Sequence, residues 1–291
     1  METWYFSPYP EHLFPEHDVS SPLDILYIDE YTLDFFTRKS QMVRHQRKHT
    51  RRHPPGDEIY RDEIHKVSMF EVDGIKQQQY CENLCYIAKL FLDHKTLYND
   101  VEPFLFYVLC EFDDRGYHVV GYYSKEKYSE MGYNLACILT LPAYQRKGYG
   151  RFLIEFSYEL SKKEGKVGSP EKPLSDLGLV SYRSYWSSVI LEKLSTWKSP
   201  TVSVSDLMRV TSIMLDDLVS TMQYLGLIKY WNGQYVVCVS PELVKEMYEK
   251  RKRKRGTPVY PSKLHWAPLK VDIKRDKWMI SSKLKKKDEE N

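Results

Sequence analysis

Apolar residues follow two periodicities along the middle of the chain. Three runs are strand-like: SMFEVDG at 68–74, FLFYVLCEFD at 104–113 and YHVVGYYSKEK at 117–127, with a hairpin turn at 114–116 between the last two. Between the first and second runs, YCENLCYIAKLFLD at 80–93 places its apolar residues on one stripe of a helix. Strands that alternate with helices predict a mixed sheet of the α/β class as the centre of the fold.

A single stretch, NLACILTLPAYQRKGYGR at 134–151, joins a strand to a helix through a glycine loop. Residues 135–140 are mostly apolar, as in a buried strand, and Pro142 ends the strand because proline has no N–H to donate. The helix that follows carries an apolar face and ends at Gly165. Backbone N–H groups of such a loop and the positive end of the helix dipole together hold a phosphate.

The form of this loop excludes two common nucleotide sites. The sequence contains no Gly-Lys-Ser/Thr of a Walker loop and no G-x-G-x-x-G of a dinucleotide loop. The pattern present from Gln145 to Gly150, Q-x-x-G-x-G, resembles the pyrophosphate loop of the acetyl-CoA-dependent N-acetyltransferases. An ordinary glycine-bearing turn between a strand and a helix has the same outline, so the glycines alone do not decide between the two.

The N-terminal part, at 25–53, predicts two short strands and then a helix. Asp29, Thr32, His45 and His49 have the x2, x12, x3 spacing of a ββα zinc finger. Zinc prefers thiolate or imidazole, and the first pair here is a carboxylate and a hydroxyl. Asp29, His45 and His49 remain the metal candidates, but structural zinc sites close with four ligands. We therefore expect a finger-shaped unit that its aromatic core holds together without metal.

The C-terminal part has a different pattern. Two prolines and two glycines at 166–186 predict an irregular segment, followed by a helix from Leu177. The segment 201–239 reads helix, turn, helix and a hairpin closed at Asn232-Gly233, which is winged-helix-like. Lys250–Arg255 is a run of six cations, and the final KLKKKDEEN is predicted to be disordered.

Composition adds limits to this organisation. The chain has 291 residues, of which 42% are hydrophobic, enough for a sizeable core. Its net charge is only +3, which does not by itself indicate a nucleic-acid partner. The five cysteines show no disulfide-like spacing, and neither a signal peptide nor a long apolar run is seen. We expect a reduced, intracellular protein.

Several long strings resemble the MYST family of histone acetyltransferases: RRHPPGDEIYR, NLCYIAKLFLDHKTLY, EPFLFYV, GYYSKEK, YNLACILTLPAYQRKGYG and GSPEKPLSDLGLVSYRSYW. The similarity extends from WYFSPYP to about Leu269. It is greatest to the branch that serves as the catalytic subunit of nucleosomal histone-four and histone-two-A acetylase complexes. The resemblance implies an α/β (α+β) fold with a central mixed sheet of the acyl-CoA N-acyltransferase type. An N-terminal finger-like ββα unit and a C-terminal winged-helix-like segment would flank the sheet.

The resemblance also implies domain bounds. We expect a MYST-type histone acetyltransferase domain at 1–275, with a degenerate C2HC-type finger at 22–56, an acetyl-CoA-binding core at 57–190 and a winged-helix-like region at 191–275. Residues 276–291 would form a disordered tail. That branch usually has a chromo-like domain, which these residues do not contain. Either the sequence is the catalytic part of a longer protein or this member is minimal.

Family fingers commonly carry the pattern Cys, Cys, His, Cys. Here Asp29, Thr32 and His49 stand at the three cysteine positions, which puts zinc binding in doubt.

The reaction that the resemblance implies is acetyl transfer from acetyl-CoA to a lysine ε-amine. A free lysine has a pKa of about 10.4, so a base must remove a proton at neutral pH. Glu171, in S-P-E-K-P, matches the family's general base. In a partly apolar cleft its pKa would be raised, which makes a better base. From the residues alone, Glu171 is an exposed loop glutamate beside Lys172.

Cys137 matches the family's active-site cysteine. It would either form a covalent acetyl-cysteine or line the pocket as a small apolar group. Covalent catalysis needs a thiolate and a nearby base, and buried cysteines are more often inert. We favour direct attack from a ternary complex.

Further contacts follow from the same resemblance. Ile138, Leu139 and Thr140 would contact acetyl-CoA along the strand edge. The residues that would cradle the pyrophosphate are Gln145, Arg146, Lys147, Gly148, Tyr149, Gly150 and Arg151. Ser175 and Ser184 match two more contacts, although a hydroxyl there would cap a helix equally well. Lys95 matches a lysine that family members acetylate on themselves; otherwise it would pair with Asp93 or Asp100.

The expected partners are core histone tails, histone four first, and subunits of a nucleosomal acetyltransferase complex in the nucleus. Lys250–Arg255 would add an auxiliary nucleic-acid contact, and we expect no membrane association. The winged-helix-like segment and the basic run also favour a DNA- or nucleosome-binding module. However, its helix SIMLDDLVSTMQYL is acidic and apolar, unlike a groove reader. A small-molecule N-acetyltransferase would have the same glycine loop, but the match after Gly165 argues against it.

Overall fold

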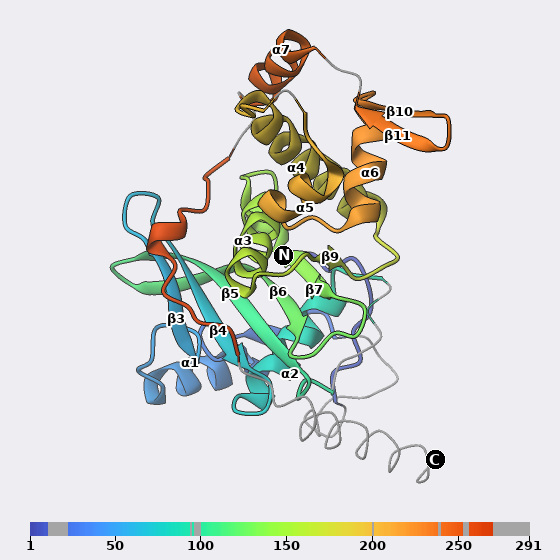
Figure 1. The fold of residues 1–291 in the computed structure, drawn as a ribbon. Helices are drawn as coiled ribbons and strands as arrows, with labels where there is room; N and C mark the ends of the chain where they lie inside the picture. The colour runs from blue at the N-terminus through green and yellow to red at the C-terminus, as the bar shows by residue number, and fades with distance from the viewer. Residues whose placement is uncertain are drawn as a thin grey trace. The chain divides into compact units, whose positions relative to one another are not determined.

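The computed structural model describes residues 1–10, 23–93, 95, 100–199, 201–237, 240–252 and 256–269 (Figure 1). The chain divides into two compact units. The first comprises Met1–Ser124 and Leu141–Ala143, and the second comprises Lys125–Thr140 and Tyr144–Asn291. The tail predicted to be disordered, 276–291, and the end of the basic run, 253–255, lie outside the described residues.

The first unit is built on a sheet with the strand order β3 (Asp57–Asp62), β4 (Val67–Asp73), β5 (Phe104–Asp113) and β6 (Gly116–Glu126). β4 pairs antiparallel with β3 and with β5. Short turns join β3 to β4 and β5 to β6, and such turns permit only antiparallel neighbours. The α/β fold around a central sheet is confirmed. The mixed sheet that we predicted is antiparallel in this unit, while a parallel pair occurs in a separate two-stranded sheet of the second unit.

Helix α2 (Gln78–Lys89) carries the apolar stripe that the sequence predicts between the first two strands. Leu84, Cys85 and Ala88 are buried. The backbone N–H groups of Trp4 and Tyr5 donate to the carbonyl of Leu90, so the N-terminal segment is fixed at the end of this helix.

A small ββα arrangement precedes the sheet. β1 (Tyr27–Ile28) pairs antiparallel with β2 (Phe35–Phe36), and α1 (Lys39–Lys48) follows. This is the element order that the sequence predicts for 25–53. His49 comes one residue after the end of α1 and caps it, because its N–H donates to the carbonyl of His45.

The second unit is organised on two long helices, α3 (Tyr149–Glu164) and α4 (Asp176–Ser195). Aromatic residues form their contact: Trp186 Nε1 donates to the Tyr158 hydroxyl over 2.8 Å, and Tyr182 packs beside Trp186. Burial raises the pKa of both Tyr158 and Tyr182, so both phenols stay protonated.

The rest of this unit has the predicted order of helix, turn, helix and hairpin. The elements are α5 (Val204–Thr211), α6 (Leu215–Tyr224), β10 (Ile228–Trp231) and β11 (Gln234–Val237). Asn232 and Gly233 form the turn, and both have positive φ.

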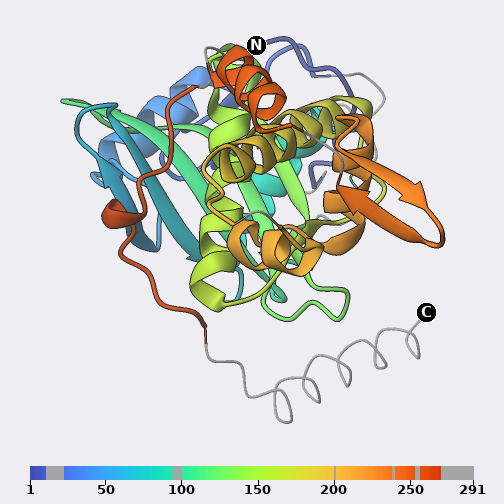
Figure 2. The ribbon, with the colours of Figure 1, turned by 45° about the horizontal axis from the view of Figure 1, so that its top comes forward.

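Helix α7 (Pro241–Lys252) lies along α4, as Figures 1 and 2 both show, and Val244 joins the core there. No helix among the described residues is long and apolar enough to cross a membrane.

Candidate active site

The glycine loop connects β8 (Cys137–Thr140) to α3 through a short 3₁₀ turn, η2 (Pro142–Tyr144). Gly148 is the N-cap of α3 with a φ of 98°, and Arg146 is also left-handed at 61°. Gln145 Nε2 donates to the carbonyl of Thr140 over 3.1 Å, which folds the loop back onto the end of the strand. A Cβ on Gly150 would stand 3.5 Å from Thr140 Oγ1, so the backbone is close to the strand here. The first N–H groups of α3 have no partner within the helix and favour an anion.

Cations surround the start of α3. Arg146 and Lys147 are exposed, and the Lys147 ammonium lies 5.0 Å from the centre of the Tyr144 ring. Arg151 is half-buried in the first turn, with its guanidinium 5.6 Å from the Tyr185 ring of α4. The loop therefore presents two exposed positive charges and one held against α4.

The two predicted serines lie on α4 in different roles. Ser175 is the N-cap of α4 and accepts from Gly178 N–H over 3.1 Å, so the capping alternative describes its local contact. Ser184 is exposed, and its carbonyl accepts from the hydroxyl of Ser188. Arg151 Nη1 is 3.5 Å from the same hydroxyl. This chain of contacts places Ser184 near the start of α3.

The strand β8 carries the other predicted contacts. Leu139 is only 4% exposed, so its side chain belongs to the core and only its backbone is left for a ligand. Ile138 and Thr140 are half-buried, as is Cys137 at the beginning of the strand.

The loop with Glu171 returns to the strand that precedes Cys137. β9 (Ser169–Pro170) pairs in parallel with β7 (Tyr133–Leu135). The Glu171 N–H donates to the carbonyl of Leu135 over 2.8 Å, and its side chain is exposed. A carboxylate on the surface and the half-buried Cys137 thus come from neighbouring backbone segments of one unit.

A further carboxylate, Asp217 of α6, was not predicted as a site residue. Its Oδ2 accepts from the Ser169 hydroxyl over 2.6 Å, and its Oδ1 lies 3.0 Å from Lys172 Nζ. The residues that it contacts flank Glu171 on both sides. The helical spacing of α6 would have indicated that the Asp217 side chain points inward, because it lies on the same buried face as Leu218 and Thr221.

Lys95 belongs to the first unit and is half-buried. Its neighbours 94 and 96–99 lie outside the described residues, and its self-acetylation remains a prediction.

The four finger positions contact one another, three of them through hydrogen bonds. Asp29 is 2% exposed, and its Oδ2 accepts from the Thr32 N–H and hydroxyl, each over 2.9 Å. The Thr32 hydroxyl is also 2.9 Å from His45 Nε2. A hydroxyl has one proton, which goes to Asp29, so His45 donates to it. The His49 ring stacks on the His45 ring with centroids 4.1 Å apart.

These residues do not fit a structural zinc ion. The hydrogen bonds among Asp29, Thr32 and His45 already use the donor atoms that would face a metal. A neutral hydroxyl is also a poor zinc ligand. Among the described residues, no group of three His, Cys, Asp or Glu side chains is arranged to hold a metal.

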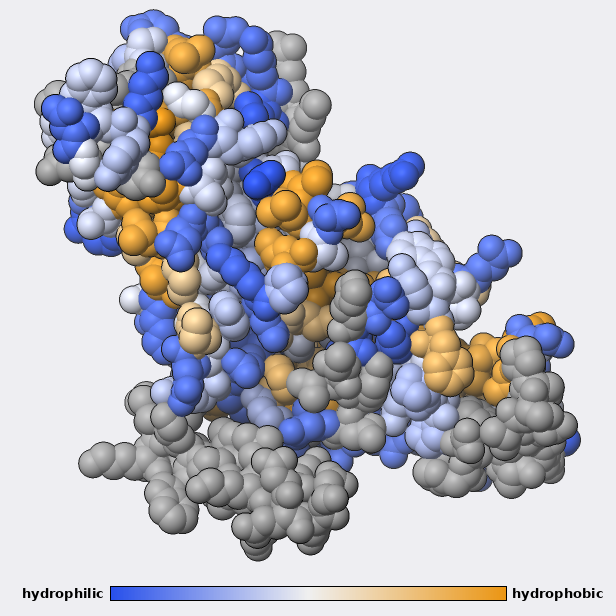
Figure 3. Space-filling model, turned by 90° about the vertical axis from the view of Figure 1, so that its right-hand side faces the viewer, coloured by the Kyte–Doolittle hydropathy of each residue, from blue (hydrophilic) through white to orange (hydrophobic). Residues whose placement is uncertain are grey.

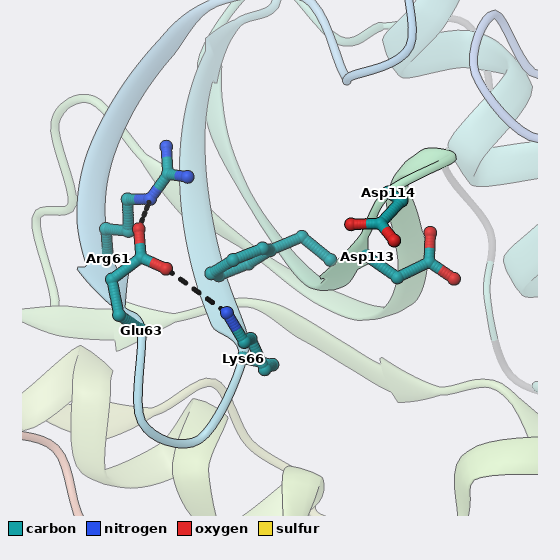
Figure 4. A pocket seen from close by; sticks show the side chains of 6 residues that line it. Arg61, Glu63, Lys66, Asp113 and Asp114 are labelled. Carbon is teal, nitrogen blue, oxygen red and sulfur yellow. Dashed lines mark hydrogen bonds and ion pairs between the residues drawn. The ribbon is translucent and has the colours of Figure 1, made fainter.

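A shallow cavity of about 420 Å³ lies elsewhere, in the first unit (Figure 4). Its cations are already paired, because Arg61 Nε and Lys66 Nζ both contact the Glu63 carboxylate. It contains none of the predicted site residues, so we do not connect it with the glycine loop.

Comparison with known proteins gives two family matches. The MOZ/SAS family matches residues 53–264, and the MYST family zinc finger domain matches residues 1–48. Histone acetyltransferase of the MYST family 2 from Arabidopsis thaliana is 58% identical over 270 residues, which is 93% of this chain. Histone acetyltransferase ESA1 from Saccharomyces cerevisiae is 51% identical over 268 residues, or 92% of this chain. The chain spans 58% of the length of each of these two relatives.

Proposed function

The chain belongs to the MYST (MOZ/SAS) family, and on this premise we propose that it is a histone lysine N-acetyltransferase. It transfers acetyl from acetyl-CoA to lysine ε-amines of nucleosomal histone tails. The observation that carries this proposal is the hydrogen bond from Glu171 N–H to the carbonyl of Leu135. Through this bond the chain keeps a carboxylate beside the end of β7, directly before β8, the strand that leads into the glycine loop.

Acetyl-CoA is the donor that the loop geometry suits. The diphosphate would lie at the start of α3, where Gly148 and Gly150 leave the backbone open and the helix dipole favours negative charge. Arg146, Lys147 and Arg151 would supply positive charge. The acetyl and pantetheine groups would follow the backbone of Ile138, Leu139 and Thr140, while Gln145 and Tyr149 shape the loop. Ser184 would add a contact from α4, and Ser175 would act mainly as its cap.

Glu171 would accept a proton from the substrate ammonium, which leaves a nucleophilic amine. The amine nitrogen then attacks the thioester carbonyl carbon, so the C–N bond forms as the C–S bond breaks. The nitrogen loses two protons in all: one goes to the departing sulfur, and Glu171 passes the other to solvent. Cys137, at the beginning of β8, would line the site without forming an acetyl-enzyme.

The rest of the chain would serve this reaction. We propose the domain bounds expected from the sequence: a finger-like unit at 22–56, the core at 57–190 and a winged-helix-like scaffold at 191–275. The order of α5, α6 and the β10–β11 hairpin supports the scaffold, and the ββα order of β1, β2 and α1 supports the finger. Lys95 would be a site of self-acetylation.

The proposed partners are core histone tails, histone four first, and subunits of a nucleosomal acetyltransferase complex, in the nucleus. Relatives named histone acetyltransferases support the substrate class. The basic run Lys250–Arg255 would contribute an auxiliary nucleic-acid contact. Leu177 and Val180 of α4, six and nine residues after Glu171, are exposed apolar side chains. Other exposed apolar side chains form orange patches on the face in Figure 3.

The test is acetyl transfer from labelled acetyl-CoA to core histones, with mass-spectrometric mapping of the products. Glu171→Gln should lower kcat by about 10²–10⁴-fold, the usual contribution of a general base, while the Kd for acetyl-CoA stays unchanged. Glu242→Gln, on the exposed first turn of α7, is the matched control and should retain wild-type turnover. The same spectra would show whether Lys95 carries acetyl. No product on any histone with the unaltered chain would overturn the proposal.

A further inference from the structure

Asp217 is a buried carboxylate that the proposed chemistry does not use. It is 4% exposed, in the first turn of α6. Burying a carboxylate is costly unless its oxygens are bonded. Here both oxygens have partners: the Ser169 hydroxyl donates to Oδ2, and the Lys172 ammonium pairs with Oδ1. The two partners lie on either side of Glu171 in sequence.

These two bonds differ in exposure and strength. Ser169 has no exposed surface, and its 2.6 Å bond to a charged acceptor is short, as charge-assisted O–H···O⁻ bonds are. The Lys172 side chain is 46% exposed, so water screens its 3.0 Å pair with Asp217. The serine bond therefore fixes the base of the loop, and the lysine pair limits the movement of its outer part.

Backbone bonds hold the same segment from two directions. Gly168 N–H donates to the carbonyl of Ser212, and Met214 N–H donates to the carbonyl of Gly168. These bonds join the loop to the connection between α5 and α6. On the opposite side, Glu171 N–H donates to the carbonyl of Leu135 in β7.

Gly168 itself is enclosed. A Cβ there would come within 2.7 Å of the Asn134 side chain, so the loop lies tightly between its two supports.

We infer that Asp217 is a positioning residue for Glu171. It contacts Ser169 before Glu171 and Lys172 after it, and these two contacts keep the exposed carboxylate in one location. This inference rests on the proposed function, in which Glu171 is the general base. A misplacement of about 1 Å at a catalytic group can cost about 100-fold in rate. Asp217 does not touch the substrate in this assignment, and its effect passes through Ser169 and Lys172.

Two single variants and their combination test the inference. Asp217→Asn removes the charge, and Lys172→Met removes the partner from a half-exposed position where folding is not at risk. Each should lower kcat by about 10- to 100-fold with an unchanged Kd for acetyl-CoA. The double variant should lose no more than the stronger single variant, because both changes break one pair. Lys172→Arg, which keeps the charge, should restore most of the activity.

Asp216→Asn is the matched control. Asp216 is the neighbouring residue in the same first turn of α6, but its side chain is exposed. It has the same relation to the helix dipole as Asp217 and should keep wild-type turnover. If Asp216→Asn lost as much activity as Asp217→Asn, the effect would belong to the helix and the inference would be wrong.

Hydrogen–deuterium exchange provides a readout that does not depend on activity. Asp217→Asn and Lys172→Met should speed exchange of the Glu171 amide, which is bonded to the Leu135 carbonyl, by about tenfold or more, whereas Asp216→Asn should not. Unchanged exchange would overturn the inference even if the chain proved inactive on histones. Wild-type kcat in both variants, beside an inactive Glu171→Gln, would overturn it and leave the proposed function standing.

Discussion

Cys137 and Glu171 lie on neighbouring backbone segments, although they belong to different parts of the sequence. Cys137 begins β8, while Glu171 follows β9, which pairs with β7 two residues before Cys137. The sequence predicted the strand and the irregular loop because Pro170 and Pro173 interrupt regular structure. It did not predict the parallel pairing that joins them, since a two-residue strand such as β9 has no periodicity to recognise.

Cys137→Ala separates the two roles left open for the thiol. We expect near-normal kcat at saturating acetyl-CoA, because in direct attack the thiol only fills space at the beginning of β8. A small rise in the Kd for acetyl-CoA is expected from the lost side-chain volume. Steady-state kinetics and equilibrium binding of acetyl-CoA would measure both quantities. Loss of all turnover with binding intact would instead support a covalent acetyl-cysteine.

The contacts of Asp217 could not be predicted from the sequence. In the sequence, SIMLDDLVSTMQYL reads as an acidic, apolar helix that argues against groove reading. Only the phase of α6 separates the exposed Asp216 from the buried Asp217. The helical spacing of the apolar residues Leu218 and Met222 and of Thr221 defines the buried face and therefore predicts which of the two aspartates is buried. The identity of the partners, 45 and 48 residues earlier in the chain, is not contained in any local pattern.

At the scale of elements, the ββα unit was predicted in order and spacing but not in its chemistry. The x2, x12, x3 spacing brings Asp29, Thr32 and His45 together, as it would bring zinc ligands together. We expected an aromatic core, and Phe36 does pack against the His45 ring at 5.1 Å. The additional finding is a hydrogen-bonded chain from His45 through Thr32 to Asp29.

The stability of this unit should fall at low pH and should not change when a chelator is added. Burial favours the neutral form of Asp29, but hydrogen bonds from Thr32 and Gln46 outweigh it and lower its pKa. A carboxylate with a lowered folded pKa stabilises the fold above its unfolded value of 3.8 and loses that effect as the pH falls through the folded value. Thermal unfolding should therefore be unchanged by EDTA at neutral pH, and the melting temperature should fall below about pH 4.

Asp29→Asn provides the control, because it keeps the shape but has no proton to gain, and should flatten the acid dependence of this unit. Metal analysis of purified protein addresses the same question directly. Stoichiometric zinc, or a lower melting temperature in EDTA, would contradict a hydrogen-bonded finger.

At the scale of the whole molecule, the C-terminal end of the described chain returns to α3. Val259 N–H donates to Glu155 Oε1, and Lys163 Nζ donates to the carbonyl of Leu264. These contacts join residues 104 and 101 positions apart, so no reading of local sequence would have found them. The segment 256–264 follows α7 (red after α7 in Figure 1) and runs along α3 from its first residues to its last turn.

Gly256 meets the glycine loop at the start of that helix. A Cβ built on Gly256 would lie 3.3 Å from the Cα of Gly148, the left-handed N-cap of α3. A methyl group at this distance pushes either the C-terminal segment or the loop by a few tenths of an ångström, and a larger side chain pushes further. Because the proposed anion site is made of backbone N–H groups, such a shift would weaken each hydrogen bond to a diphosphate, and hydrogen bonds to charged groups are worth about 1.5–3 kcal/mol each.

Gly256→Val should therefore raise the Kd for acetyl-CoA by about tenfold, which corresponds to about 1.4 kcal/mol, while kcat at saturation changes little. Since a side chain added at Gly256 would press on the Gly148 backbone, a fall in kcat alone would contradict this account. Tyr260→Phe, in the same segment, keeps the ring beside Lys263 and should leave the Kd unchanged. Isothermal titration with coenzyme A measures the effect, and an unchanged Kd in Gly256→Val would show that the loop does not depend on the C-terminal segment for its shape.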